Sequence, residues 1–140
     1  MGEDGQHRLT LRSQLTELAR VSPWLETLTR ACAIAERTRF AIDLCLEEAL
    51  SNIVRHGYAG DGGQSIVVEF TPQPDQLIFT IEDTAPHFQP SADAPAPPTS
   101  LEEMTPGGLG LPLMRSFADA VTWEPLETGN RLTLVFSRRS

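Results

Sequence analysis

Residues 43–58 read DLCLEEALSNIVRHGY, and the other elements of the chain are interpreted relative to this segment. Its apolar side chains recur at three- and four-residue steps, which predicts an amphipathic helix with one face in a core. Glu48 and Asn52 lie four positions apart, so their side chains are expected one above the other on the same face. One residue turns a helix by about 100°, so Glu47 is expected to point elsewhere. Gly57 is a natural end for the helix. The apolar positions are Ile42, Leu46, Ala49, Leu50 and Ile53.

Strand and helix patterns surround this helix. Residues 22–23 (Ser-Pro) are typical of an N-cap and a first-turn proline, so a helix is predicted to start there, and helical turns can begin as early as Leu15. The helix that contains residues 43–58, called the organising helix below, is expected to begin at Thr38. Residues 127–130 (ETGN) suit the positive φ of a hairpin tip. Strands are predicted over residues 7–15, 65–71, 76–83, 120–124 and 131–137. A third helix is predicted to begin at the glycines of residues 107–110 and to continue to residue 118.

This order of elements predicts an α+β fold in one domain that spans residues 1–140, with a mostly antiparallel sheet and helices on one face. Residues 84–108 hold six prolines and show little periodicity. A stretch of that length inside a compact domain is usually a functional lid or a disordered segment, and we interpret it as a lid.

Composition narrows the classes of partner. The 140 residues include 19 acidic and 11 basic side chains, which gives a net charge of −8. This charge argues against nucleic acid or an anionic membrane as a direct partner. No run approaches the roughly 20 apolar residues of a membrane helix, and the first residues lack the pattern of a signal peptide, so a cytoplasmic protein is expected. A folded protein or a small ligand fits the charge better.

Two polar features follow the organising helix. Asp83 ends a predicted strand just before the proline-rich segment, and residues 107–110 (GGLG) open the third helix. Glycines let backbone N–H groups approach a ligand closely, and a helix N-terminus suits phosphate. A carboxylate and an amide on a helix are more often part of a solvated face, but the three features in this order indicate a site.

These residues resemble the anti-sigma-factor serine kinases, a branch of the GHKL ATPase superfamily that also includes gyrase and sensor histidine kinases. The family's N-box, Glu-Ala-x-x-Asn with a His-Gly-Tyr-like ending, matches residues 48–52 and 56–58. Its first glycine box matches residues 83–90 (DTAPHFQP), except that Ala85 replaces the glycine. Its second glycine box matches residues 108–110. The resemblance implies the GHKL (Bergerat) fold, a two-layer α/β sandwich in which helices pack on a mixed sheet.

The resemblance also implies cofactors and roles. ATP and Mg²⁺ would be the cofactors, with Asn52 as the metal ligand and Glu48 as the catalytic base. Asp83 would receive the exocyclic amine of adenine. Ala85 would lie against the nucleotide, where its methyl group adds bulk that glycine lacks. The remaining nucleotide-binding residues, in the lid over the phosphates, would be Gly108, Leu109 and Gly110.

The implied function is an ATP-dependent protein-serine kinase and anti-sigma regulatory factor. It would phosphorylate a serine of a STAS-domain anti-anti-sigma factor, with a sigma factor as the competing partner, and the resemblance allows a homodimer. The alternative is a binding module with the same fold that regulates its partner by docking alone. Glu48 together with Asn52 favours the kinase, because docking requires no base beside a metal ligand. A fragment of a larger sensor kinase ranks last, since the chain shows no dimerisation helix pair.

Overall fold

The computed structural model describes residues 7–58, 62–86 and 110–138. In chain order the elements are β1 (Arg8–Arg12), the 3₁₀ helix η1 (Leu15–Arg20), α1 (Val21–Cys32), α2 (Glu36–Asn52), the π-helical turn η2 (Ile53–Gly57), β2 (Ser65–Pro72), β3 (Gln76–Asp83), α3 (Gly110–Phe117), β4 (Ala120–Pro125) and β5 (Asn130–Ser137). Of the predicted lid, only residues 84–86 belong to the described part. Gly108 and Leu109 lie outside it.

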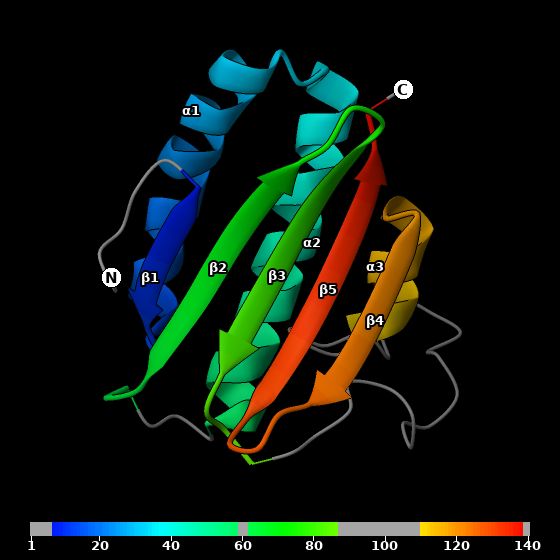
Figure 1. Cartoon of the computed structure of the whole chain (residues 1–140). Helices are drawn as coiled ribbons and strands as arrows, with labels where there is room; N and C mark the ends of the chain where they lie inside the picture. The colour runs from blue at the N-terminus through cyan, green and yellow to red at the C-terminus, as the bar shows by residue number, and fades with distance from the viewer. Residues whose placement is uncertain (1–6, 59–61, 87–109, 139–140) are drawn as a thin grey trace, which may run out of the picture.

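The described strands form one five-stranded sheet in the order β1-β2-β3-β5-β4, and each pair is antiparallel. The helices α1, α2 and α3 cover one face of this sheet (Figure 1). The predicted α+β fold with helices on one face is therefore confirmed. The sheet of the described residues contains no parallel pair, because every direct connection is a hairpin or a return through the helical layer.

The core lies between the sheet and the helices. Alternate residues of the central strand β3 point inward, namely Leu77, Phe79, Ile81 and Asp83. Phe79 packs against the rings of Phe70 and Phe136 from the neighbouring strands, and it makes a T-shaped contact with Trp24 of α1, with ring centroids 6.1 Å apart. From α2, the buried apolar residues are Ile42, Cys45, Leu46, Ala49 and Leu50.

Two helix starts and one strand end differ from the prediction. α1 begins at Val21, directly after the 3₁₀ turns from Leu15, so residues 22–23 lie inside its first turn and no side chain caps it. The same 3₁₀ turns shorten the first strand, which ends at Arg12. α2 opens at Glu36, two residues before Thr38. α3 begins at Gly110, one of the glycines at which the third helix is predicted to start. The expected end at Gly57 is confirmed, although the last turn is π-helical.

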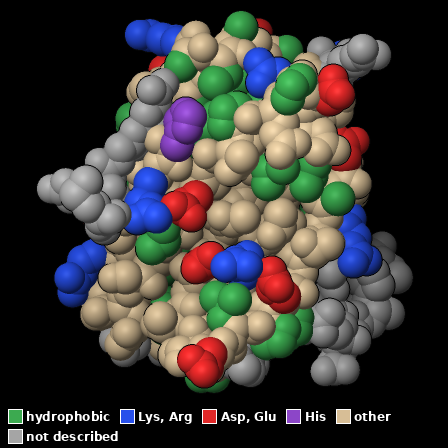
Figure 2. Space-filling model, in the orientation of Figure 1, with side chains coloured by type: hydrophobic (Ala, Val, Ile, Leu, Met, Phe, Trp, Pro, Cys, Tyr) green, Lys and Arg blue, Asp and Glu red, His purple; other side chains and the backbone are tan. Residues whose placement is uncertain are grey.

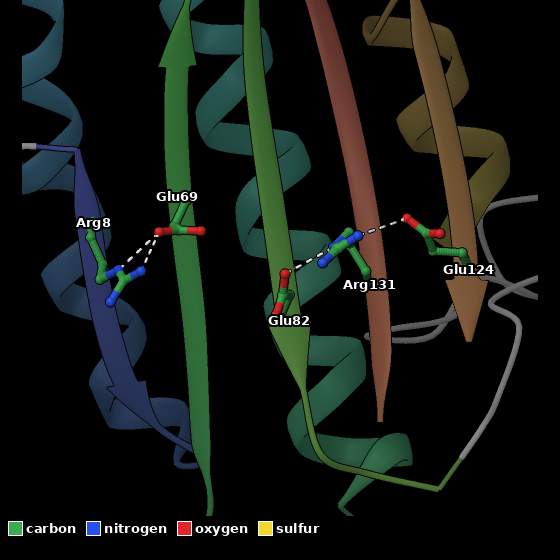
Figure 3. Close-up of polar contacts among 5 residues, drawn as sticks. All are labelled: Arg8, Glu69, Glu82, Glu124 and Arg131. Carbon is green, nitrogen blue, oxygen red and sulfur yellow. Dashed lines mark hydrogen bonds and ion pairs between the residues drawn. The ribbon is translucent and has the colours of Figure 1, made fainter. Parts of the chain in front are cut away.

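The other face of the sheet is partly solvent-exposed and carries ion pairs across its strands (Figure 2). Arg8 on β1 donates through Nε to Glu69 Oε2 on β2 at 2.9 Å (Figure 3). Arg131 on β5 lies between Glu82 on β3 and Glu124 on β4, at 2.8 and 3.1 Å. These residues are directly opposite one another in the register, where opposite charges stabilise a sheet.

The C-terminal end of α1 has two unusual features. Ala33 follows the helix in the left-handed region, with φ 52° and ψ 48°, and is the one non-glycine residue of the described part with positive φ. Arg138 donates through Nη2 to the carbonyl of Cys32, the last helical residue, at 2.8 Å. This cation satisfies a terminal carbonyl and tethers the helix end to the chain after β5.

Replacing Ala33 by glycine is expected to stabilise the protein. The left-handed conformation costs an L-residue roughly 1–2 kcal/mol, and glycine loses about 0.5–1 kcal/mol through the entropy of the unfolded chain, so a net gain of about 0.5–1 kcal/mol is expected. Urea unfolding followed by circular dichroism measures this difference. The matched control is Ala31→Gly in the preceding helix turn, where glycine should destabilise by about 1 kcal/mol. Equal effects of the two changes would contradict the prediction.

Candidate functional site

Two of the predicted site residues line a small cavity between the helices and the sheet. Asn52 from the end of α2 and Asp83 from the end of β3 line it together. The cavity measures about 20 Å³, which is room for about one water molecule. A larger ligand would require it to widen. The other lining residues are mostly apolar, namely Ala49, Ile53, Met114, Trp123, Asn130 and Leu132.

Asp83 is a buried carboxylate with two hydrogen-bond donors. Its Oδ1 accepts from the backbone N–H of Ala85 and from Nδ2 of Asn130, both at 2.9 Å. The side chain is 5% exposed, and this burial raises the pKa of Asp83, while the hydrogen bonds from Asn130 and Ala85 oppose the rise. Both donors in the described part go to Oδ1, so Oδ2 is available to a ligand.

Asn130 organises this part of the site, and sequence reasoning missed it. It is 2% exposed, and its Nδ2 points at Asp83 Oδ1 and at the carbonyls of Ala85 and Pro86, the latter two at 3.2 Å. Its Oδ1 accepts from Trp123 Nε1 at 3.1 Å. Asn130 lies opposite Asp83 in the β3–β5 register. A local signal existed only as a hairpin tip, because asparagine after glycine is also an ordinary turn residue.

Gly129 allows this close approach. Its φ of +105° confirms the predicted positive φ of the hairpin tip. A Cβ atom at this position would lie 1.8 Å from the backbone oxygen of Asp83, a distance that no side chain can adopt. Glycine is therefore required both for the conformation of the turn and for its contact with the end of β3.

Asn52 presents a polar atom that the described protein leaves unsatisfied. Its side chain is buried, at 7% exposure, and Oδ1 accepts no hydrogen bond within the described residues. A buried acceptor without a partner costs about 1–3 kcal/mol, so an atom of this kind calls for an explanation. An amide oxygen is a ligand that a hard cation such as Mg²⁺ accepts, so the residue fits the metal role that the resemblance implies.

The ends of the two site elements are tied together by Tyr58. Its hydroxyl accepts from the backbone N–H of Thr84 at 2.7 Å and lies 3.0 Å from Thr84 Oγ1 and from the carbonyl of Ser65. The hydroxyl proton can go to Ser65, since the Thr84 hydroxyl can donate to Tyr58 in turn. The chain after α2 is therefore held against the end of β3, and this contact helps to keep Asn52 and Asp83 at the same cavity.

Ala85, the departure from the family motif, is accommodated without strain. Its side chain is 1% exposed and belongs to the core cluster. Its φ is not positive, so the backbone there requires no glycine. The residue contributes its N–H to Asp83 and its carbonyl to Asn130, which places it in the same network. Gly110 is the first residue of α3.

Glu48 is half-buried on α2 and lines a different hollow from Asn52. It forms part of a groove of about 650 Å³ between α2 and the η1–α1 segment. Four residues turn a helix by about 400°, so Glu48 is offset from Asn52 by about 40° around the axis. Because of this offset, Glu48 lines the groove, whereas Asn52 lines the cavity.

The family follows from comparison with known proteins. Residues 11–136 match the family model described as a histidine kinase-like ATPase domain, and the chain belongs to this family. Among curated proteins it is similar to the serine/threonine-protein kinase BtrW of Bordetella bronchiseptica, with 34% identity over 79% of each chain. It is also similar to the anti-sigma F factor of Clostridium perfringens, with 27% identity over 74% of this chain and 67% of that protein.

A solved structure supports the fold. The structure of the RsbU and RsbW domains of Rv1364c from Mycobacterium tuberculosis superimposes with a TM-score of 0.65 over 92% of this chain, at 14% identity. The chain spans 30% of the length of that protein chain, and the likeness concerns the fold alone. Within the described residues, no helix is long and apolar enough to cross a membrane.

The buried carboxylate gives a pH-dependent prediction. Because the pKa of Asp83 is raised in the folded state, its contribution to stability is present at low pH and is lost as the pH rises through that pKa. The free energy of unfolding of the wild type minus that of Asp83→Asn should therefore fall as the pH rises from about 4. Urea titrations across the acidic range measure this difference. The exposed Asp75→Asn variant should show no such fall, and a flat profile for Asp83→Asn would refute the assignment.

Proposed function

We propose that the chain is an ATP-dependent protein-serine kinase and anti-sigma regulatory factor. One observation carries the proposal: a buried carboxylate, Asp83, and a buried amide oxygen, Asn52 Oδ1, which accepts no hydrogen bond from the described residues, line one cavity. Family membership implies that the ligand is ATP, and the names of the two similar proteins support kinase and anti-sigma activity.

Asp83 would recognise the adenine base. Its Oδ1 is held by Asn130 and Ala85, so Oδ2 is the oxygen that would accept the exocyclic amine of adenine. A hydrogen bond to a charged acceptor is stronger than one between neutral groups, and the apolar walls would strengthen it further. The adenine ring requires more than the present 20 Å³, so the cavity would have to widen around it.

Asn52 would hold Mg²⁺ through Oδ1. Mg²⁺ bound there would supply positive charge that offsets the negative charge of the transferring phosphoryl group. The described residues contain no group of three or more His, Cys, Asp or Glu side chains that could hold a metal. A site with one protein ligand suits Mg²⁺, which usually keeps several waters and binds substrate phosphates.

Glu48 would act as the base. It would accept the proton of the acceptor serine hydroxyl as the serine oxygen bonds to the γ-phosphorus of ATP. The bond from that phosphorus to the bridging oxygen would break, with ADP as the leaving group. The acceptor would be a serine of a STAS-domain anti-anti-sigma factor, with a sigma factor as the competing partner. If the chain regulates by docking alone, neither ATP nor Glu48 is needed for its action.

Binding of Mg-ATP is the first test, and isothermal titration calorimetry measures it. The wild type should show saturable binding, and Asp83→Asn should weaken it about tenfold, because an amide lacks the charge assistance of the carboxylate. Mg-GTP, which carries a carbonyl where adenine has its amine, serves as the matched ligand and should bind the wild type more weakly. Absence of saturable heat with Mg-ATP would leave the docking module as the better description.

Transfer of phosphate is the second test. Glu48→Gln keeps the shape of the side chain but removes its basicity, so transfer from labelled ATP to a STAS-domain protein should slow by about 10²- to 10⁴-fold. Calorimetry should show Mg-ATP binding near the wild-type value. Glu36→Gln, an exposed change in the same helix, is the control and should leave the rate unchanged. An undiminished rate in Glu48→Gln would remove that residue from the catalytic role.

A further inference from the structure

The groove beside Glu48 has one apolar wall and one charged wall. The η1–α1 segment supplies most of the apolar wall, whereas α2 supplies mainly polar and charged side chains. The volume of about 650 Å³ is typical of ligand-binding hollows, which hold roughly 300–1,000 Å³. The lining residues used below are Leu15, Leu18, Asp43, Glu47, Glu48 and Arg55.

The apolar wall is open to solvent. Leu15 is 45% exposed, and it is one of three large hydrophobic side chains that are exposed in the described part of the chain. Leu18, one helical turn later, is partly buried and packs on the core. An exposed leucine at the rim of a hollow gains free energy when an apolar side chain covers it.

The charged wall is predominantly acidic. Asp43, Glu47 and Glu48 line the groove together with one basic residue, Arg55. Neighbouring acids outside the groove are neutralised, since Glu17 pairs with Arg20 at 3.0 Å and Glu26 pairs with Arg39 at 2.8 Å. In contrast, the side chains of Asp43 and Glu47 make no ion pair or hydrogen bond within the described residues. The groove therefore favours an occupant with positive charge.

We propose that this groove seats the acceptor segment of the substrate protein, a short stretch that carries a basic and an apolar residue beside the serine. The inference rests on the proposed function, because the serine hydroxyl must reach Glu48. The nucleotide residues Asn52 and Asp83 line the cavity on the other side of Glu48. The acceptor segment would therefore approach α2 from the groove and the nucleotide from the cavity. Glu48 would lie between the acceptor and the nucleotide.

The three carboxylates that line the groove have different roles in this proposal. Asp43 and Glu47 bind the basic residue of the segment, and Leu15 and Leu18 contact its apolar residue. Glu48 takes the proton of the serine. Changes at Glu47 therefore alter the affinity for the acceptor, whereas changes at Glu48 alter the rate of transfer once the acceptor is bound.

Two short fluorescein-labelled peptides test the proposal by fluorescence anisotropy. Both carry one serine with leucine nearby, and they differ only in having arginine or glutamate beside the serine. The wild type should bind the arginine peptide about tenfold more tightly than the glutamate peptide, and more weakly as salt rises. Glu47→Lys should weaken the arginine peptide about tenfold. Glu127→Lys, an equal charge reversal at an exposed residue that does not line the groove, should leave the affinity for the arginine peptide unchanged.

Three results would overturn the inference: equal binding of the two peptides, no measurable binding of either, or equal effects of Glu47→Lys and Glu127→Lys. Circular dichroism of both variants confirms that each is folded. Failure of the groove is distinguishable from failure of the kinase. A chain that binds Mg-ATP and transfers phosphate but does not discriminate the peptides loses only the groove. A chain that discriminates the peptides but does not bind Mg-ATP keeps the groove and loses the kinase.

Discussion

The burial of the Asp83 carboxylate is the constraint around which the described structure is arranged. A charged group 5% exposed at the end of the central strand is costly unless donors compensate it. Asn130 and the backbone of Ala85 supply those donors, and Gly129 lets the β4–β5 turn come close enough to deliver one of them. The turn, the strand end and the first residues after it therefore form one unit.

The fold places two residues with an unfavourable free energy of burial, Asn52 and Asp83, at the same cavity. Asn52 Oδ1 lacks a partner in the described part, and Asp83 pays a desolvation penalty, so neither is explained by folding alone. Proteins accept such local costs at functional sites, where a ligand supplies the missing interactions. Tyr58 ties the chain after α2 to Thr84 and Ser65, so the site is held in place before any ligand arrives.

Helix α2 lines both the cavity and the groove. Its buried side packs on the sheet and brings Asn52 to the cavity, while its opposite flank forms the acidic wall of the groove. Glu48 lines the groove one helical turn before Asn52, and this position is compatible with the role of base proposed for it. The π-helical turn after Asn52 adds a residue to the last turn, a feature often found at functional sites.

Local pattern was enough to predict most elements of the fold and part of the site. The two-residue period of β3 and the helical period of α2 depend on neighbouring residues, so they are legible in the sequence, as are the glycine of the hairpin tip and the helix end at Gly57. The family motifs pointed to Asp83 and Asn52, and the structure brings both to one cavity. The helix starts were less predictable because 3₁₀ turns lead into α1 without a side-chain cap.

Tertiary structure alone decided the rest. Asn130 holds Asp83 across 47 positions of sequence, and locally it is indistinguishable from a turn residue. The groove combines η1 with α2, and Glu47 makes no ion pair with a described residue because the fold places none of the described cations beside it. Hydrogen bonds and charge pairs act through space at a few ångströms, whereas sequence periodicity reports only which side of an element faces the core. The sequence therefore determined the elements and their buried faces, and the packing of those elements determined which polar groups meet.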